Sequence, residues 1–70
     1  MTRYEIRLPY AVSPALQDAF PEMTAVQIAP DETLLIGELR DQSELHGLIA
    51  RIGDLGLDIA EVRQASARRG

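Results

Sequence analysis

The sequence contains no cysteine and no tryptophan, and its aromatic residues are only two tyrosines and one phenylalanine. Without cysteine the chain forms neither a disulfide nor a thiolate metal site, which are two of the usual stabilising devices of small domains. Seventy residues make a single domain, which buries only about 60% of the surface that its unfolded chain exposes. The core must therefore consist mostly of Leu, Ile, Val and Ala, and burial against a partner would add stability.

Lysine is also absent, and the basic residues are all arginines in a chain with a formal net charge of −4. These arginines do not gather in one segment that could displace counterions from a phosphate backbone, so we expect no nucleic-acid binding. The start, MTRYEIRLPY, alternates charged with apolar residues. It therefore resembles neither a signal peptide nor a membrane span, and we expect a cytoplasmic protein that does not bind membranes.

The first part of the chain predicts a strand followed by a short helix. Residues 2–8 alternate between apolar and charged side chains, as a half-buried strand does, and Pro9 closes the strand. Ser13 and Pro14 are typical of an N-cap and of the first position of a helix. Pro21 ends this helix after about two turns.

The middle of the chain predicts a hairpin. Residues 23–29 and 33–39 have strand character, and the turn residues 30–32 join them closely enough for antiparallel pairing. The segment 33–39 is apolar on both faces, which is typical of a central strand or of a strand with a covered outer face. Residues 58–64 predict a final strand.

Between the last two strands the sequence predicts one helix with its start and stop signals. Asp41 is placed to cap the first turn, and Glu44 is placed to reach back to it as in a capping box. Gly56 has the position of a left-handed terminating residue, after which Leu57 packs back on Ile52 in a Schellman motif. One apolar stripe at helical spacing is formed by Leu45, Leu48, Ile49, Ile52 and Leu55.

This order of elements predicts an α+β fold. We expect a ferredoxin-like split βαββαβ two-layer sandwich, with a short first helix and an antiparallel four-stranded sheet in which the first and third strands are central. The predicted domain comprises residues 1–65, and residues 66–70 are predicted to form a flexible C-terminal tail.

A two-layer fold leaves one face of its sheet uncovered, and the third strand supplies aliphatic side chains to that face. The alternation places Leu35, Gly37 and Leu39 there, whereas a reversed register would place Leu34 and Ile36 there. In either case the exposed pair predicts an interaction surface, with a homodimer as the first expectation and an unrelated protein as the other partner. The expected polar margin of this surface, able to form reciprocal ion pairs across a two-fold axis, consists of Arg3, Glu5 and Arg7.

His46 is the only histidine and therefore the only candidate general base. It lies at the flank of the helical stripe, where a histidine more often bonds a neighbouring carbonyl or carboxylate. One histidine supplies too few ligands for a metal site in a single chain, and no cofactor motif is present. Gly53 lies on the same flank of the helix, where it indicates either close approach of another backbone or ligand, or a tolerated small residue.

The segment DQSELHGLIARIGDLGLDIAEVRQ and the opening RYEIRL resemble a set of small actinobacterial proteins of unassigned function. Those proteins share a YEIR strand and a helix reading D-Q-x-x-L-H-G-L-x-x-R-x-x-D-L-G-L. The resemblance touches both ends of the chain and departs between residues 10 and 30. It implies no known chemistry, but it includes His46 and Gly47 in the shared pattern.

Two function classes follow from these observations. The favoured one is a small non-catalytic binding or regulatory accessory module that self-associates through the open sheet face. The alternative is a dimeric ferredoxin-like protein that binds a small apolar molecule, or acts on it as an isomerase, cyclase or oxygenase. In that alternative the polar groups of the pocket would be His46, Tyr4 and Tyr10.

Overall fold

The computed structural model describes residues 2–65. The order of elements agrees with the sequence prediction: β1 (Thr2–Leu8), α1 (Pro14–Ala19), β2 (Thr24–Ala29), β3 (Glu32–Leu39), α2 (Gln42–Asp54) and β4 (Glu61–Ala65). The predicted C-terminal tail lies outside the described residues. Within them, neither helix combines the length and the apolar character needed to cross a membrane.

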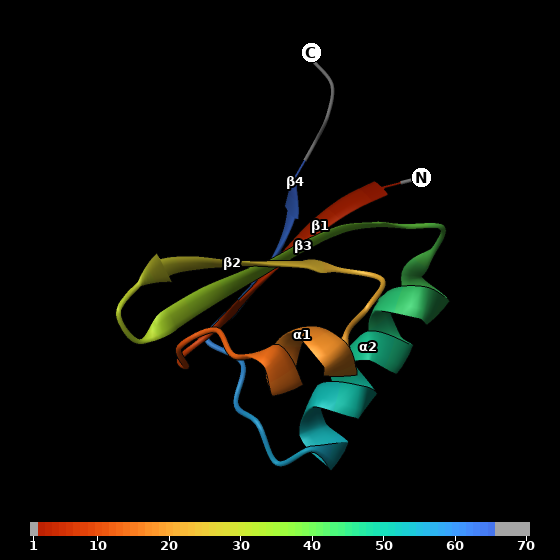
Figure 1. Cartoon of the computed structure of the whole chain (residues 1–70). Helices are drawn as coiled ribbons and strands as arrows, with labels where there is room; N and C mark the ends of the chain where they lie inside the picture. The colour runs from red at the N-terminus through yellow and green to blue at the C-terminus, as the bar shows by residue number, and fades with distance from the viewer. Residues whose placement is uncertain (1, 66–70) are drawn as a thin grey trace.

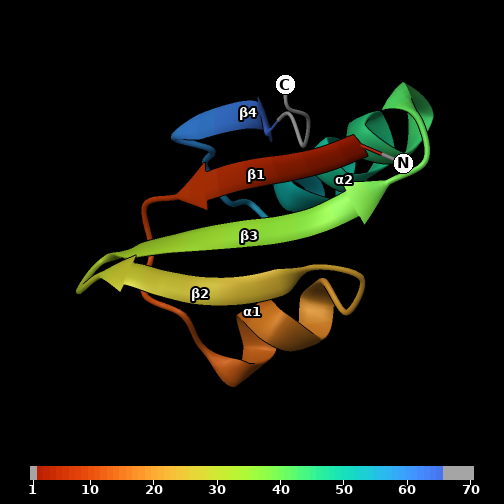
Figure 2. The ribbon, with the colours of Figure 1, turned by 90° about the horizontal axis from the view of Figure 1, so that it is seen from above.

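The four strands form one sheet in the order β2-β3-β1-β4, and every neighbouring pair is antiparallel. The prediction that the first and third strands are central is therefore confirmed. Both helices lie on the same side of the sheet (Figure 1), and the view from above shows the four strands side by side (Figure 2). We call the side without helices the open face and the other side the helix side.

Side-chain caps begin both helices as the sequence predicts. The Ser13 hydroxyl accepts a hydrogen bond from the Leu16 amide at 3.1 Å, and the Asp41 carboxylate accepts one from the Glu44 amide at 3.0 Å. The second hydrogen bond of the capping box differs from the prediction. The Glu44 carboxylate accepts it from the amide of Arg40, one residue before the cap residue Asp41. The Arg40 side chain also pairs with this carboxylate at 3.2 Å, so both groups are held at the helix start.

The end of α2 is the predicted Schellman motif. Gly56 has a φ of 77°, a left-handed conformation that other residues rarely adopt. Its amide donates to the Gly53 carbonyl at 2.9 Å, and the Leu57 amide donates to the Ile52 carbonyl at 3.1 Å. These are the two bonds that define the motif, and they satisfy carbonyls that would otherwise end the helix unpaired.

The core lies between the helix side of the sheet and the two helices. Its buried members are Tyr4, Ile6, Leu8, Leu16, Phe20, Met23, Leu35, Leu39, Leu48 and Ile52. The prediction of one continuous apolar stripe on α2 is correct for its central residues and wrong for Leu55, whose exposed fraction is 52%. Leu55 is the C-cap residue that follows the last helical residue, Asp54, at the end of α2 that lies farthest from the sheet (Figure 1).

The last strand begins later than predicted. Residues 58–60 lie before β4, which starts at Glu61. The backbone amide of Asp58 donates to the Tyr10 hydroxyl at 2.9 Å, and the Ala60 amide donates to the Arg7 carbonyl at 2.8 Å. The tyrosine thus binds part of the segment that the sequence predicts to belong to the strand.

Candidate functional site

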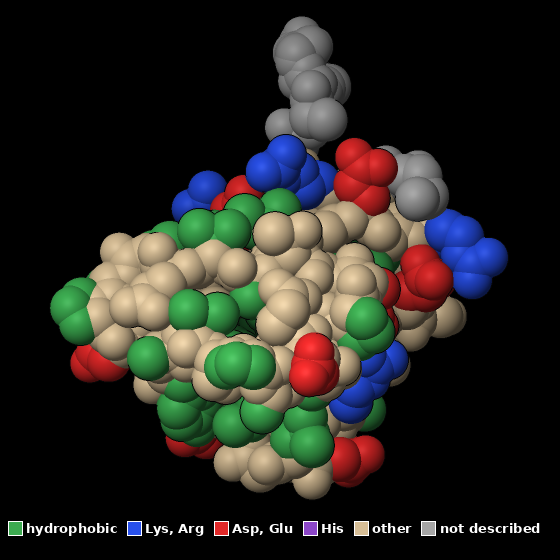
Figure 3. Space-filling model, viewed as in Figure 1, with side chains coloured by type: hydrophobic (Ala, Val, Ile, Leu, Met, Phe, Trp, Pro, Cys, Tyr) green, Lys and Arg blue, Asp and Glu red, His purple; other side chains and the backbone are tan. Residues whose placement is uncertain are grey.

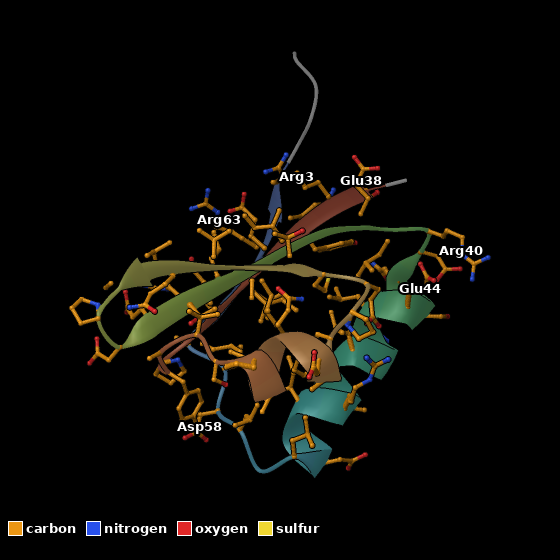
Figure 4. All side chains as sticks on the ribbon, in the orientation of Figure 1. Arg3, Glu38, Arg40, Glu44, Asp58 and Arg63 are labelled. Carbon is orange, nitrogen blue, oxygen red and sulfur yellow. The ribbon has the colours of Figure 1, made fainter. Side chains whose placement is uncertain are left out.

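The open face divides into an apolar half and a charged half. The apolar half lies on β2 and β3 and consists of Val26, Ile28, Leu34 and Ile36. The charged half lies mainly on β1 and β4 and consists of Arg3, Glu5, Arg7, Glu38, Glu61 and Arg63. Arg3, Glu38 and Arg63 project from the sheet on the side away from the helices (Figure 4). In the space-filling view, charged side chains gather along this upper side and hydrophobic side chains adjoin them (Figure 3).

The apolar half is contiguous because its members are neighbours across the two strands. Val26 lies opposite Leu34, and Ile36 follows two residues later on the same face of β3. Val26 and Ile28 have exposed fractions of 40% and 48%, while Leu34 and Ile36 are half-buried. The β2–β3 hairpin therefore presents a band of branched aliphatic side chains to solvent, and such bands mark interaction surfaces.

The first of the two registers considered for the third strand is wrong. Leu35 lies opposite Ile6, and Leu39 lies opposite Thr2, on the helix side. Their exposed fractions are 0% and 4%, so they belong to the core and not to an interface. The reversed register holds, and it brings Leu34 and Ile36 to the open face.

Gly37 also belongs to the helix side, where it makes room for Met23. A Cβ atom at this position would approach the Met23 sulfur more closely than non-bonded atoms can, and it would crowd the Glu22 carbonyl. Met23 is itself buried in the core. The glycine thus serves packing within one chain rather than contact with a partner.

Several side chains of the charged half already form ion pairs within one chain. The Arg7 guanidinium lies 3.1 Å from the Glu61 carboxylate and 3.6 Å from that of Glu32, and Arg63 lies 3.9 Å from Glu5. Arg3 lies opposite Glu38 in the strand register. Of the two arginines predicted to form the margin, Arg7 therefore bridges strands of its own sheet. These pairs are solvent-accessible, so each contributes at most about 1 kcal/mol to stability.

A concave region, which we call the groove, lies on the helix side between α1 and the residues that follow α2. It has a volume of about 390 Å³ and is lined by Tyr10, Ala11, Ser13, Ala15, Leu16, Ala19, Leu55 and Leu57. The lining is mostly aliphatic. Its two hydroxyl groups are already bonded, that of Ser13 as the helix cap and that of Tyr10 to the amide and carboxylate of Asp58.

The predicted polar groups of a catalytic pocket do not meet. Tyr4 is buried in the core, Tyr10 lines the groove of the helix side, and His46 is an exposed residue of α2 that does not line that groove. Within residues 2–65, His46 makes no side-chain hydrogen bond, so nothing orients it as a base. Gly53 is exposed, and a Cβ atom there would meet open space, so no backbone of residues 2–65 outside its own helix approaches it.

Arg51 has a larger role than its sequence position indicated. The guanidinium donates to the Ala19 carbonyl and to the Glu22 carboxylate, both at 3.1 Å. A second nitrogen lies 3.0 Å from the other Glu22 oxygen, and the group stands 5.6 Å from the centre of the Phe20 ring. Arg51 thus joins α2 to the end of α1 by a bidentate pair and a cation–π contact.

This pair predicts a pH dependence of stability. The Arg51 guanidinium, by hydrogen-bonding the carboxylate, holds the pKa of Glu22 below its ordinary value, against an opposing effect of partial burial. The pair therefore stabilises the folded state fully above the pKa of an unfolded-chain glutamate, about 4.3, and this contribution is lost as the pH falls through the lower folded pKa.

We expect Glu22→Gln to remove that part of the acid sensitivity. The free energy of unfolding, measured by urea titration at neutral pH and near pH 3, should fall less for the variant than for the wild type. The difference should be at most about 1 kcal/mol because the pair is solvent-accessible. Equal losses in the two proteins would show that the pair does not couple folding to protonation.

The fold and its open face define the class of the protein: a small α+β domain with an antiparallel four-stranded sheet, two helices on one side, and an aliphatic band on the other. The chain belongs to the family described as a domain of unknown function (DUF8691), whose model matches residues 3–63. The match includes every strand and helix at least in part. No curated protein and no solved structure matches the chain.

Proposed function

We propose that this protein is a small non-catalytic accessory module that self-associates as a homodimer through the open face of its sheet. The observation that carries the proposal is the aliphatic band of Val26, Ile28, Leu34 and Ile36, which no element of the described chain covers. A short chain without disulfides gains stability when a second copy removes such a band from water. We also propose that the fold is of the ferredoxin-like split βαββαβ type, which the strand order and the one-sided helices support.

A two-fold dimer is compatible with this surface because one half of the open face is apolar and the other half is charged. An isologous interface brings the same patch of both copies together, so aliphatic side chains meet aliphatic side chains across the axis. The charged half then borders the contact on the side of β1 and β4, as polar residues do at the rim of an interface. Arg3 is the arginine of this half that forms no ion pair within residues 2–65, and it is therefore the first candidate for a pair across the axis.

The experiment compares the mass in solution of three proteins by sedimentation velocity and light scattering. We expect the wild type to exceed the mass of one chain, and Ile36→Glu to reduce the mass while it keeps the fold, because a carboxylate in the aliphatic band resists desolvation. Leu55→Glu is the matched control, since Leu55 is an exposed leucine on the other side of the molecule. A wild type that remains monomeric at high micromolar concentration would contradict the proposal, as would equal effects of the two substitutions.

The alternative, a protein that binds a small apolar molecule, is supported by the groove between α1 and the residues that follow α2. Its volume of about 390 Å³ lies within the range of small-molecule sites, about 300–1,000 Å³. An enzyme acting through His46 has no comparable support, because this side chain is exposed away from the groove. A bound ligand would be detected as protection of Leu16 and Leu57 resonances against solvent probes, with no change at Ile36.

A further inference from the structure

The strand β4 is an open and uninterrupted edge of the sheet. It pairs only with β1, and its other side borders no strand of the described chain (Figure 2). The opposite edge, β2, differs because its pairing shifts register between Gln27 and Ala29 and Pro30 follows directly. Bulges and prolines prevent an edge from pairing with another chain, whereas β4 keeps a regular register over its whole length.

The helices do not extend over β4. Val62 lies opposite Ile6 on the helix side of the sheet, yet its exposed fraction is 38% whereas that of Ile6 is 0%. Its neighbours Glu61, Arg63 and Gln64 are exposed as well. The edge therefore presents both its free backbone groups and a branched aliphatic side chain to solvent.

The order of charges on β4 is complementary to itself in one register. Glu61 and Arg63 are two residues apart and point to the same side, the open face, with Val62 between them pointing to the helix side. In an antiparallel pair of two β4 strands with the two-fold axis at Val62, each Glu61 lies opposite the partner's Arg63. Opposite charges in directly facing positions stabilise a strand pair.

We propose that β4 pairs with β4 of a second copy of this chain, antiparallel and centred on Val62, so that the two sheets become one continuous sheet. The contact consists of backbone hydrogen bonds, two reciprocal Glu61–Arg63 pairs on the open face, and the two Val62 side chains against each other on the helix side. Moving the axis by one residue to Arg63 places two guanidinium groups opposite each other. Charged side chains usually protect an edge strand from pairing with another chain. Here they favour the register centred on Val62 and disfavour the register centred on Arg63.

This edge contact is independent of the dimer proposed above. It uses the margin of the sheet and a side chain on the helix side, whereas the other contact uses the aliphatic band of β2 and β3. Its axis is perpendicular to the sheet, whereas the axis of a face-to-face dimer lies parallel to it. The two contacts close into a group of four chains when their axes intersect at right angles, and each contact remains when the other is removed.

The absence of cysteine from the chain allows a direct test by cross-linking. Val62→Cys is made together with Ile36→Glu, so that the open face does not contribute. Facing residues of an antiparallel pair have Cα atoms about 4.5–5.5 Å apart, within the span of a disulfide. Mild oxidation should therefore yield a covalent dimer. Val26→Cys in the same background is the control, since Val26 is about equally exposed on the other edge strand, and it should stay a single chain.

Charge reversal then tests the register. Adding Glu61→Arg, or separately Arg63→Glu, to the cysteine variant should abolish the cross-link, because facing groups then repel each other. An equimolar mixture of the two reversed variants should restore it, because each arginine again faces a glutamate. The inference is overturned if Val62→Cys gives no covalent dimer, if the control cross-links equally, or if mixing restores nothing. These results do not depend on the mass difference between the wild type and Ile36→Glu.

Discussion

Leu35→Glu is expected to unfold the domain. Leu35 is fully buried in the core and lies opposite Ile6 at the centre of the sheet. A carboxylate there has no partner, and burying an unpaired charge costs several kcal/mol even after the surrounding structure relaxes. A single core of this size supplies only about 3–5 kcal/mol of stability. The circular dichroism of the variant should therefore lack the native signal, and urea should produce no cooperative transition.

The neighbouring substitution Leu34→Glu is the matched control for this result. It introduces the same group one residue earlier, on the open face, where Leu34 is half-buried and lies opposite Val26 and Arg7. We expect this variant to keep a cooperative unfolding transition and to lose self-association. If Leu35→Glu unfolds with a midpoint like that of Leu34→Glu, the strand register described here is incorrect.

Gly37→Ala is expected to lower the free energy of unfolding by about 1–3 kcal/mol, the usual cost of overpacking a core. The added methyl group would collide with the buried Met23 sulfur and crowd the Glu22 carbonyl. Met23 cannot withdraw freely, because it lies in the core cluster. The measurement is urea unfolding of the purified variant at neutral pH.

A double-mutant cycle identifies the cause of that loss. Met23→Ala alone creates a cavity, but in combination with Gly37→Ala it also removes the collision, so the double variant should lose less stability than the two single losses combined. Gly47→Ala is the control, because a Cβ atom there meets open space within the helix α2. It should raise the free energy of unfolding by up to about 1 kcal/mol. A neutral Gly37→Ala, or losses that simply add, would contradict the packing described.

The open face shows how far periodicity can predict an interaction surface. An aliphatic band on the third strand was predictable, because residues 33–39 carry more large apolar side chains than one face can bury. Which side they belong to was not predictable, because a strand that is apolar on both faces has no alternation to fix its register. Pairing with Ile6 and Leu8 of β1 decided it. The contribution of Val26 and Ile28 to the open face followed only from the pairing of β2 with β3.

The roles of Arg51 and His46 depended on contacts between distant parts of the chain. Helical spacing places both on α2, but the partners of Arg51, at Ala19 and Glu22, come from the end of α1 and the turn after it. Nothing in the residues around Arg51 indicates those partners. For His46, a position at the flank of the apolar stripe does not decide whether the side chain is buried. In the structure, the orientation of α2 on the sheet leaves this side chain exposed.

The sequence by itself determined the order of the elements and several of their ends, through the caps at Ser13 and Asp41, the left-handed turn at Gly56, and the alternation of β1. These signals act through bonds and side-chain patterns within a few residues, so they are complete in the local sequence. The tertiary structure alone decided which side of β3 faces solvent, which residues Arg51 joins, and that β4 is an edge that no other strand of the described residues borders. Each of these depends on strands or helices far apart in the chain, whose relative position is fixed only when the core packs.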